Sequence, residues 1–168
     1  MNRNASLTHV ALAVALVLLQ ALLFQSVHFL SVVPLFYVYA VLRWPSDMPR
    51  WLQVLAGFVV GLAVDMLLDT LGMHAVATTL VAYLRQPMLA SSFSGETEGF
   101  SPGEKTMGLL DFWKYAAVLV LVHHFTLYLV ESFSFFSLWW LLSRTLGSTA
   151  LTLLLVFLLE RFRGRARH

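Results

Sequence analysis

The sequence has no cysteine and few charged residues, and each shortage excludes a class of protein. Without cysteine there is no disulfide, no thiol nucleophile and no thiolate metal site. Charged residues make up 12% of the 168 residues, whereas a soluble domain carries roughly a quarter. Hydrophobic residues make up 59%, and the mean hydropathy is +0.77. A water-soluble core cannot bury this much apolar sequence, so the composition predicts a protein surrounded by lipid.

Six apolar segments are candidates for membrane-spanning helices, since about 20 helical residues cross the hydrocarbon layer. They cover residues 7–24, 29–43, 52–71, 73–84, 115–130 and 138–159. The second and fourth are short, and we expect them to be tilted, re-entrant or broken. The first lacks a clean cleavage site after its apolar run and is interpreted as a retained helix, not a signal peptide. The sequence predicts an all-α, polytopic membrane protein with a single membrane domain over residues 1–168.

The basic residues predict the orientation, because Lys and Arg stay on the cytoplasmic side. With six spans and a cytoplasmic N-terminus, Arg144 alone lies outside. The other ten of the eleven lie inside: Arg3, Arg43, Arg50, Arg85, Lys105, Lys114, Arg161, Arg163, Arg165 and Arg167. Both termini are then cytoplasmic, with a cytoplasmic loop over about 86–112 and a basic tail over 160–168. Such a tail is typical of a stop-transfer cluster that touches anionic lipid headgroups, and not of a nucleic-acid-binding arm.

The third predicted span carries two glycines and two acids at four-residue intervals: Gly57, Gly61, Asp65 and Asp69. At this spacing they form one helical band, and the GxxxG pair favours close helix contact in lipid. Asp65 precedes Gly72 by about 10 Å of helix, so a lipid-facing carboxylate there is costly by several kcal/mol. Three interpretations stay open: a packing face whose acid accepts hydrogen bonds, an ion or proton site, or an anchor for a partner subunit.

The fifth predicted span carries His123 and His124 near the middle of the membrane. His124, Tyr128 and Glu131 lie close to one helical stripe, which could relay protons or bind a metal. The chain contains no HExxH motif, and buried structural histidines are the simpler interpretation. We therefore assign no catalytic, cofactor-binding or metal-binding residue.

Arg144 is the only cation predicted outside, and three acids lie on or near that side: Asp65, Asp69 and Glu131. We expect Arg144 to contact one of these carboxylates, with His74 as a further candidate partner. Water is scarce at this depth, so such a contact offsets local charge.

The last predicted span carries a second small-residue face, formed by Ser143 and Gly147. Trp139 and Trp140 lie just before it and are typical of an aromatic belt at the membrane interface. This face indicates helix association, either within the chain or with a partner.

One block of the sequence resembles a known family. A glycine-containing span reaches an acid, a Leu-Gly turn follows, and a small-residue span opens with His74 and Ala75. Pro34 in the second span, the basic end and the stretch His123–Phe135 agree with the same family. Over nearly its whole length the chain is similar to MreD, the family of bacterial rod shape-determining membrane proteins.

The resemblance implies a non-enzymatic subunit of the rod complex (the elongasome) in the bacterial inner membrane, without a cofactor. The family scaffolds lateral peptidoglycan synthesis and so regulates cell shape. Its partners are the bitopic protein MreC, the MreB filament, the RodA glycosyltransferase and a class B penicillin-binding transpeptidase. The residues expected to carry the interaction are Gly57, Gly61, Asp65, Asp69, Gly72 and His74.

Two other functions are alternatives. A substrate-binding membrane subunit of a vitamin-type transporter needs a wet outward cavity. Its lining would come from Asp65, Asp69, His74, Glu131 or Arg144. An intramembrane enzyme would have to use His123, His124 and Glu131, the residues with the most plausible chemistry at membrane depth.

Overall fold

The computed structural model describes residues 3–24, 32–70, 72–93, 99–132 and 137–165, and all regular secondary structure in these ranges is helical. The helices are α1 (Arg3–Phe24), α2 (Val38–Leu42), α3 (Arg50–Leu68), α4 (Met73–Ser92), α5 (Glu104–Met107), α6 (Leu109–Ser132) and α7 (Leu138–Arg165). The predicted all-α class is confirmed.

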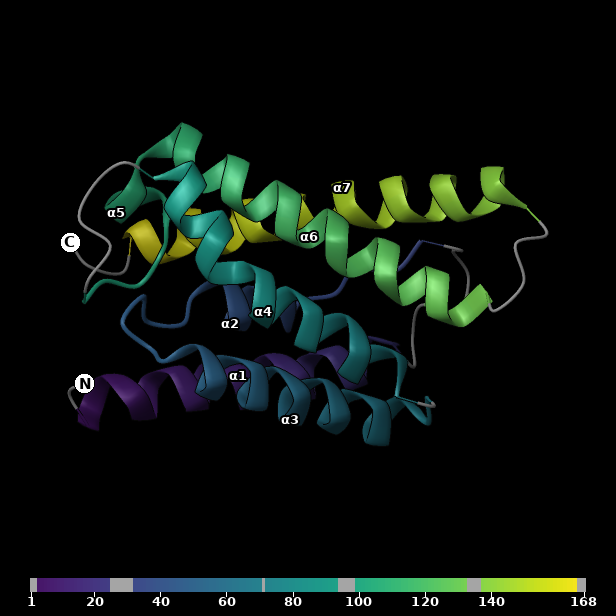
Figure 1. The fold of residues 1–168 in the computed structure, drawn as a ribbon, viewed down its shortest axis with the longest axis horizontal. Coiled ribbons are helices and arrows are strands. Elements are labelled where there is room, and N and C mark those ends of the chain that lie inside the picture. The colour runs from purple at the N-terminus through teal and green to yellow at the C-terminus, as the bar shows by residue number, and fades with distance from the viewer. Residues whose placement is uncertain (1–2, 25–31, 71, 94–98, 133–136, 166–168) are drawn as a thin grey trace.

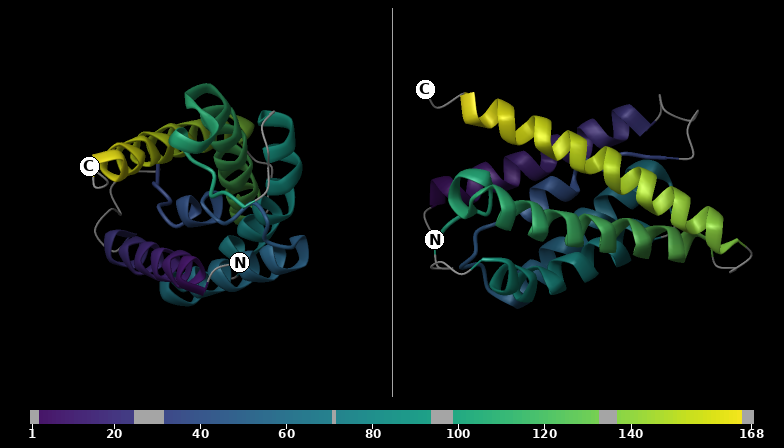
Figure 2. Two further views of the ribbon diagram at one scale, coloured as in Figure 1. Left: turned by 90° about the vertical axis from the view of Figure 1, so that its left-hand side faces the viewer. Right: turned by 90° about the horizontal axis from the view of Figure 1, so that it is seen from above.

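The long helices form a chain of neighbours around a short central one. Helix α3 packs on α4, α4 on α6 and α6 on α7, while α1 lies against α3. Helix α2 lies among them and contacts α1, α4 and α6. The long helices all run along the length of the molecule, as the two further views in Figure 2 also show. Helix α1 begins and α7 ends at the end of the molecule that holds α5 (Figure 1).

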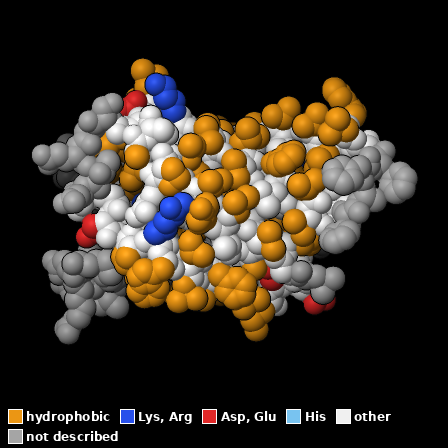
Figure 3. All heavy atoms as spheres, in the orientation of Figure 1, with side chains coloured by type: hydrophobic (Ala, Val, Ile, Leu, Met, Phe, Trp, Pro, Cys, Tyr) orange, Lys and Arg blue, Asp and Glu red, His pale blue; other side chains and the backbone are white. Residues whose placement is uncertain are grey.

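Within the described residues, three helices are long and apolar enough to cross a membrane: Arg50–Leu68, Leu109–Ser132 and Leu138–Arg163. A shorter apolar helix covers Thr8–Leu22. Large apolar side chains point outward, among them Met66, which is 79% exposed, and Trp139, which is 81% exposed. Figure 3 shows hydrophobic side chains across the middle of one face, with the visible Lys and Arg side chains toward the end that holds α5. Soluble monomers rarely expose so much contiguous apolar surface, which supports a membrane protein.

The turn between α3 and α4 is set by two left-handed residues. Helix α3 ends at Leu68; the next residue, Asp69, has a φ of 55°, and Gly72, whose φ is 82°, precedes α4. Glycine adopts positive φ without steric strain, so Gly72 suits this position. The turn returns α4 directly along α3, which places residues of the two helices side by side.

The second predicted span differs most from its prediction. Only Val38–Leu42 is helical, and residues 32–35 before it are not. Pro34 lacks an N–H and disfavours helix at the residue before it, which explains the break. Non-helical backbone at membrane depth is tolerated where protein buries it, and α1, α4, α6 and α7 surround this segment. Residues 29–31 of the predicted span lie outside the described residues.

The helix at the fourth predicted span is longer than expected. We predict its end at Leu84, but α4 continues to Ser92 with Pro87 inside the helix. Arg85 does not end the helix because its side chain is fully buried and hydrogen-bonded inside the bundle. The predicted cytoplasmic loop over 86–112 is correspondingly shorter, since it also contains α5 and the start of α6 at Leu109.

Candidate functional site

The glycine face of α3 is covered by α4. A Cβ added at Gly61 would lie 2.5 Å from both Ala75 Cα and the carbonyl oxygen of His74. A Cβ added at Gly57 would lie 2.7 Å from the Cβ of Ala82. The two backbones therefore touch where glycine leaves room, and this face serves association within the chain.

Asp65 sits at the end of the same face, 3% exposed, with both carboxylate oxygens occupied. Its Oδ1 accepts the backbone N–H of His74 at 3.1 Å and the hydroxyl of Thr70 at 2.5 Å. Its Oδ2 accepts the backbone N–H of Ala75 at 2.8 Å. His74 and Ala75 belong to the first turn of α4, whose N–H groups have no partner within the helix. Asp65 thus satisfies the N-terminus of α4 and places negative charge at the positive end of its dipole.

Asp69 does not continue the predicted band. It lies past the last residue of α3, is exposed, and its backbone N–H bonds to the carbonyl oxygen of Asp65. Asp69 and Gly72 shape the turn, while Gly57, Gly61 and Asp65 share the buried face.

A polar cluster lies in the centre of the bundle, formed by Tyr37, His74, Thr78 and His123. The hydroxyl oxygen of Tyr37 lies 2.9 Å from His74 Nδ1 and 2.8 Å from His123 Nε2. Thr78 Oγ1 lies 3.4 Å from the same hydroxyl and 3.3 Å from His123 Nε2. All four side chains are buried, and they come from three parts of the chain. The cluster joins α4 and α6 to the residue that leads into α2.

The number of hydrogens in this cluster limits the directions that its hydrogen bonds can take. The Tyr37 hydroxyl has one hydrogen, so it donates to one of the two imidazoles and accepts from the other. His123 Nδ1 is buried and has no hydrogen-bond partner among the described residues. A buried orphan donor is less tolerable than an orphan acceptor, which favours a hydrogen on His123 Nε2. The hydrogen bonds then run from His123 through Tyr37 to His74.

The neighbouring His124 and Tyr128 of α6 bond to the same α7 hydroxyls that hold the non-helical segment. His124 Nδ1 lies 2.9 Å from the carbonyl oxygen of Val120, and His124 Nε2 lies 3.2 Å from Thr152 Oγ1. The Tyr128 hydroxyl lies 2.6 Å from Ser148 Oγ. The same two α7 hydroxyls also accept hydrogen bonds from the backbone of the non-helical segment. Thr152 accepts one from the N–H of Leu35 and Ser148 one from the N–H of Val33, each at 3.0 Å. Gln20 of α1 also holds this segment, because its side-chain oxygen accepts a hydrogen bond from the backbone N–H of Phe36 at 2.7 Å.

Arg144 pairs with Glu131 at 3.1 Å near the end of the molecule opposite α5. Its guanidinium also lies over the rings of Tyr128 and Trp140, 4.3 Å from each centroid. Glu131 is thus one of the three acids that we considered as partners of Arg144. Asp65, another of them, is bound to the start of α4 instead. The His74 ring bonds to Tyr37.

The two residues of the predicted small-residue face of α7 lie in different environments. A Cβ added at Gly147 would lie 2.9 Å from the Val32 side chain, so Gly147 makes room for the non-helical segment. Ser143 is exposed, and its hydroxyl donates to the carbonyl oxygen of Trp140 at 3.0 Å.

Sequence reasoning missed a buried arginine near the end that holds α5. Arg85 is fully buried, and its Nη1 donates to Gln53 Oε1 at 3.1 Å and to the carbonyl oxygen of Pro45 at 3.4 Å. Its Nη2 donates to the carbonyl oxygen of Trp44. The available signal was Gln53, a polar residue near the start of the third predicted span. From the sequence we used Arg85 only as a cation of the cytoplasmic side and gave it no partner within the chain.

A second missed group surrounds Glu160 at the same end. Glu160 lies 3.6 Å from Arg43, and both side chains are nearly buried. The Tyr39 hydroxyl donates to Glu160 Oε1, and Arg43 Nη1 donates to the carbonyl oxygen of Pro102. This group ties α2 and the residue after it to the last turns of α7.

Within the described ranges, no three His, Cys, Asp or Glu side chains lie together as a metal site would require. Comparison with family models, curated proteins and solved structures found no match to this chain. The site is therefore defined by its own geometry. The buried polar residues bind one another and the backbone, and so hold helices α3, α4, α6 and α7 around the non-helical segment.

Proposed function

We propose that this protein is a non-enzymatic membrane subunit of the bacterial cell-elongation complex, which scaffolds lateral peptidoglycan synthesis and so maintains rod shape. The sequence block Gly57–Ala75, which resembles MreD, is the starting point. The observation that carries the proposal is that the buried polar residues of this block, Asp65 and His74, are bonded inside the chain. Asp65 binds the start of α4, and His74 binds Tyr37. Residues used in this way support a scaffold better than they support chemistry or transport.

The proposal includes six membrane crossings with both termini in the cytoplasm of the inner membrane. The crossings are α1, residues 32–43, α3, α4, α6 and α7, two of them imperfect: the second is mostly non-helical and the fourth carries Arg85. Helix α1 begins and α7 ends at the same end of the molecule (Figure 1), which supports an even number of crossings. The placement of ten of the eleven Lys and Arg residues supports that end as cytoplasmic.

The partners proposed are those of the family that the chain resembles: an MreC-like bitopic protein, the MreB filament, RodA and a class B penicillin-binding transpeptidase. The chain has little sequence outside its helices, so its cytoplasmic work depends on such partners. Its exposed faces are apolar, as a surface that meets lipid and partner helices requires.

The transporter alternative has less support. It needs an outward cavity lined by Asp65, Asp69, His74, Glu131 or Arg144. Two surface cavities, one between α1 and α3 and one between α5 and α7, are lined by none of these five residues. The geometry does not favour the enzyme alternative either, because both ring nitrogens of His124 are hydrogen-bonded, one to the carbonyl oxygen of Val120 and the other to Thr152.

The functional experiment is depletion of the protein in a rod-shaped cell, followed by affinity purification of a tagged copy from native membranes. We expect depleted cells to become round, and the tagged protein to recover an MreC-type bitopic partner. Rod shape that persists, together with no such partner, would contradict the proposal.

The topology is tested separately with reporter fusions. Alkaline phosphatase fused after Gly99 should be inactive and a fluorescent protein there bright, because that position is cytoplasmic. The reverse result is expected for fusions at Ser137, between α6 and α7. Activity of the phosphatase at Gly99 would invert the proposed orientation.

A further inference from the structure

An apolar groove of about 580 Å³ runs between α1 and α3, which lie side by side (Figure 1). The volume lies in the range of sites that hold one small molecule. From Leu52 to Leu67 the α3 wall rises about 22 Å, which exceeds the depth of one leaflet of the hydrocarbon layer, roughly 15 Å. The groove can therefore take an acyl chain over its full length.

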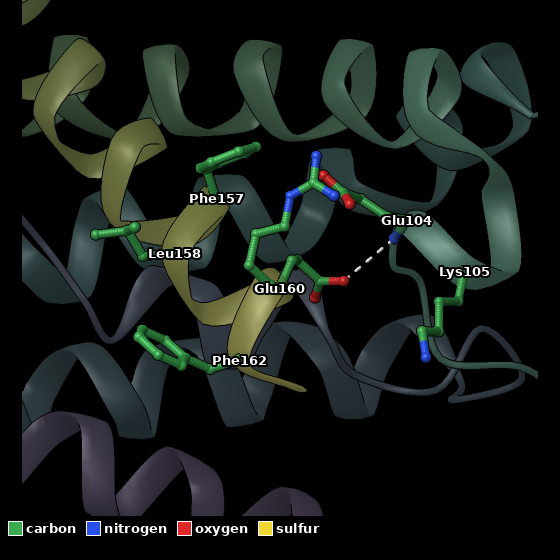
Figure 4. Close-up of a pocket in the computed structure, with 7 residues that line it drawn as sticks. Glu104, Lys105, Phe157, Leu158, Glu160 and Phe162 are labelled. Carbon is green, nitrogen blue, oxygen red and sulfur yellow. Dashed lines mark hydrogen bonds between the residues drawn. The ribbon is translucent and has the colours of Figure 1, made fainter. Parts of the chain in front are cut away.

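The lining of this groove differs from that of the cavity between α5 and α7. The latter is lined in part by the charged side chains Glu104, Lys105 and Glu160 (Figure 4). Apart from His9, the groove is lined by apolar side chains and Trp44. His9 is itself bonded within the chain, since its Nε2 lies 3.1 Å from Ser101 Oγ. The groove therefore suits an elongated apolar occupant.

Trp44, at the end of the groove nearest α5, holds a hydrogen-bond donor without a partner. Its side chain lines the groove and is 5% exposed. In the part of the chain that the structure describes, its indole N–H forms no hydrogen bond, and this N–H is not enclosed by protein. The indole N–H of a buried tryptophan usually finds an acceptor. Because Trp44 directly follows the proposed crossing 32–43, the missing acceptor lies at the depth of the lipid ester and phosphate oxygens.

The same end of the groove is positive because of Arg85. This fully buried side chain donates to the carbonyl oxygens of Trp44 and Pro45, and both of these residues line the groove. Among the described residues no carboxylate pairs with Arg85, and Asp47, an acid close to this end along the chain, is exposed to solvent. A buried cation without a paired anion is costly, and a negative group at the end of the groove reduces that cost.

We propose that the groove between α1 and α3 holds one acyl chain of an anionic phospholipid. An ester or phosphate oxygen of this lipid accepts the indole N–H of Trp44, and its negative headgroup lies over the end that Arg85 makes positive. The acyl chain lies along Ala56 and Ala63, whose small side chains keep the groove open. This binding requires a membrane but no partner protein, so it is separate from the proposed scaffold function.

The experiment titrates delipidated full-length protein in neutral detergent with phosphatidylglycerol or phosphatidylcholine of equal chain length, and counts bound lipid by native mass spectrometry. We expect one phosphatidylglycerol per chain, bound roughly tenfold more tightly than phosphatidylcholine, because only phosphatidylglycerol carries a net negative charge. Arg50→Gln with Lys114→Gln removes two exposed cations outside the groove and should leave this preference within about twofold.

Two matched pairs of variants locate the lipid. Trp44→Phe keeps an aromatic ring but removes the N–H and should weaken binding roughly fivefold, whereas Trp51→Phe, at an exposed indole, should change it less than about twofold. Val59→Phe enlarges a side chain of the groove wall and should also weaken binding, by roughly fivefold or more. Val76→Phe, at a similarly exposed valine of α4 outside the groove, should not. Thermal unfolding of each variant establishes that it is folded.

Three results would overturn the proposal. Equal affinity for the two lipids would remove the role of the charge. Equal effects within both matched pairs would place the lipid elsewhere on the surface. A dimer that binds no lipid would assign the groove to a second copy of the chain.

Discussion

Asp65 Oδ1 lies 3.1 Å from the backbone nitrogen of His74, so the acid of α3 caps the helix that follows it. The ring of the same His74 lies 2.9 Å from the Tyr37 hydroxyl. One residue therefore connects the carboxylate at the α3–α4 turn to the polar cluster in the centre of the bundle.

Replacing Asp65 should destabilise the protein according to how many hydrogen bonds are lost. Asp65→Ala leaves two buried N–H groups of α4 without a partner, and we expect a loss of about 2–4 kcal/mol. Asp65→Asn keeps one acceptor oxygen and should lose about half as much. Thermal unfolding in detergent measures both, with Asp69→Asn as an exposed control within about 0.5 kcal/mol of wild type. A loss for Asp69→Asn as large as that for Asp65→Asn would refute the capping role.

The glycine contacts predict a graded effect of alanine. Gly61→Ala places its methyl group against backbone atoms of α4, which cannot move aside, so about 1–3 kcal/mol of stability should be lost. Gly147→Ala meets the end of the Val32 side chain, which can adjust, and should be milder. The same unfolding measurement ranks them, and a Gly61→Ala variant as stable as wild type would show that α3 and α4 are farther apart.

How much of this site the sequence predicted depends on how far apart the interacting residues lie along the chain. The α3–α4 contacts were predictable because Gly57, Gly61 and Asp65 recur at four-residue intervals, and their partners lie just across a short turn. The partners of His123 were not, because Tyr37 lies far away along the chain. No local period links residues that tertiary packing brings together.

The second predicted span illustrates a different limit. Its hydropathy predicted a membrane span, and the structure shows Leu35 and Val38 buried within the bundle. Its conformation depends on hydroxyl groups of α7, because Ser148 and Thr152 supply the acceptors that a helix would provide internally. Hydropathy reports burial and not which groups satisfy the backbone.

Tyr37→Phe should remove the hydroxyl that both imidazoles share. The substitution keeps the ring and leaves buried nitrogens of His74 and His123 without this partner, so we expect a loss of about 1–3 kcal/mol. Tyr83→Phe, at a half-exposed ring, is the matched control and should be nearly neutral. Chemical denaturation distinguishes them, and equal stability of the two variants would exclude a structural role for the cluster.

The two adjacent histidines should hold their hydrogens on opposite nitrogens. His124 Nδ1 faces the carbonyl oxygen of Val120 and must donate, while Thr152 donates to its Nε2. His123 should carry its hydrogen on Nε2, because its buried Nδ1 has no partner among the described residues. Nitrogen-15 NMR of histidine-labelled protein reports each tautomer. The same tautomer at both positions would contradict the hydrogen-bond arrangement described.

The central claim is that the buried polar residues act by holding the fold, while function comes from partner binding by the folded bundle. The most direct test expresses Asp65→Asn and Tyr37→Phe variants in rod-shaped cells depleted of the wild-type protein, and measures the MreC-type partner recovered per folded molecule. The account predicts that this ratio equals that of wild type, and that loss of rod shape follows only the loss of folded protein. A variant present at the wild-type folded level that recovers no partner, or leaves cells round, would contradict it.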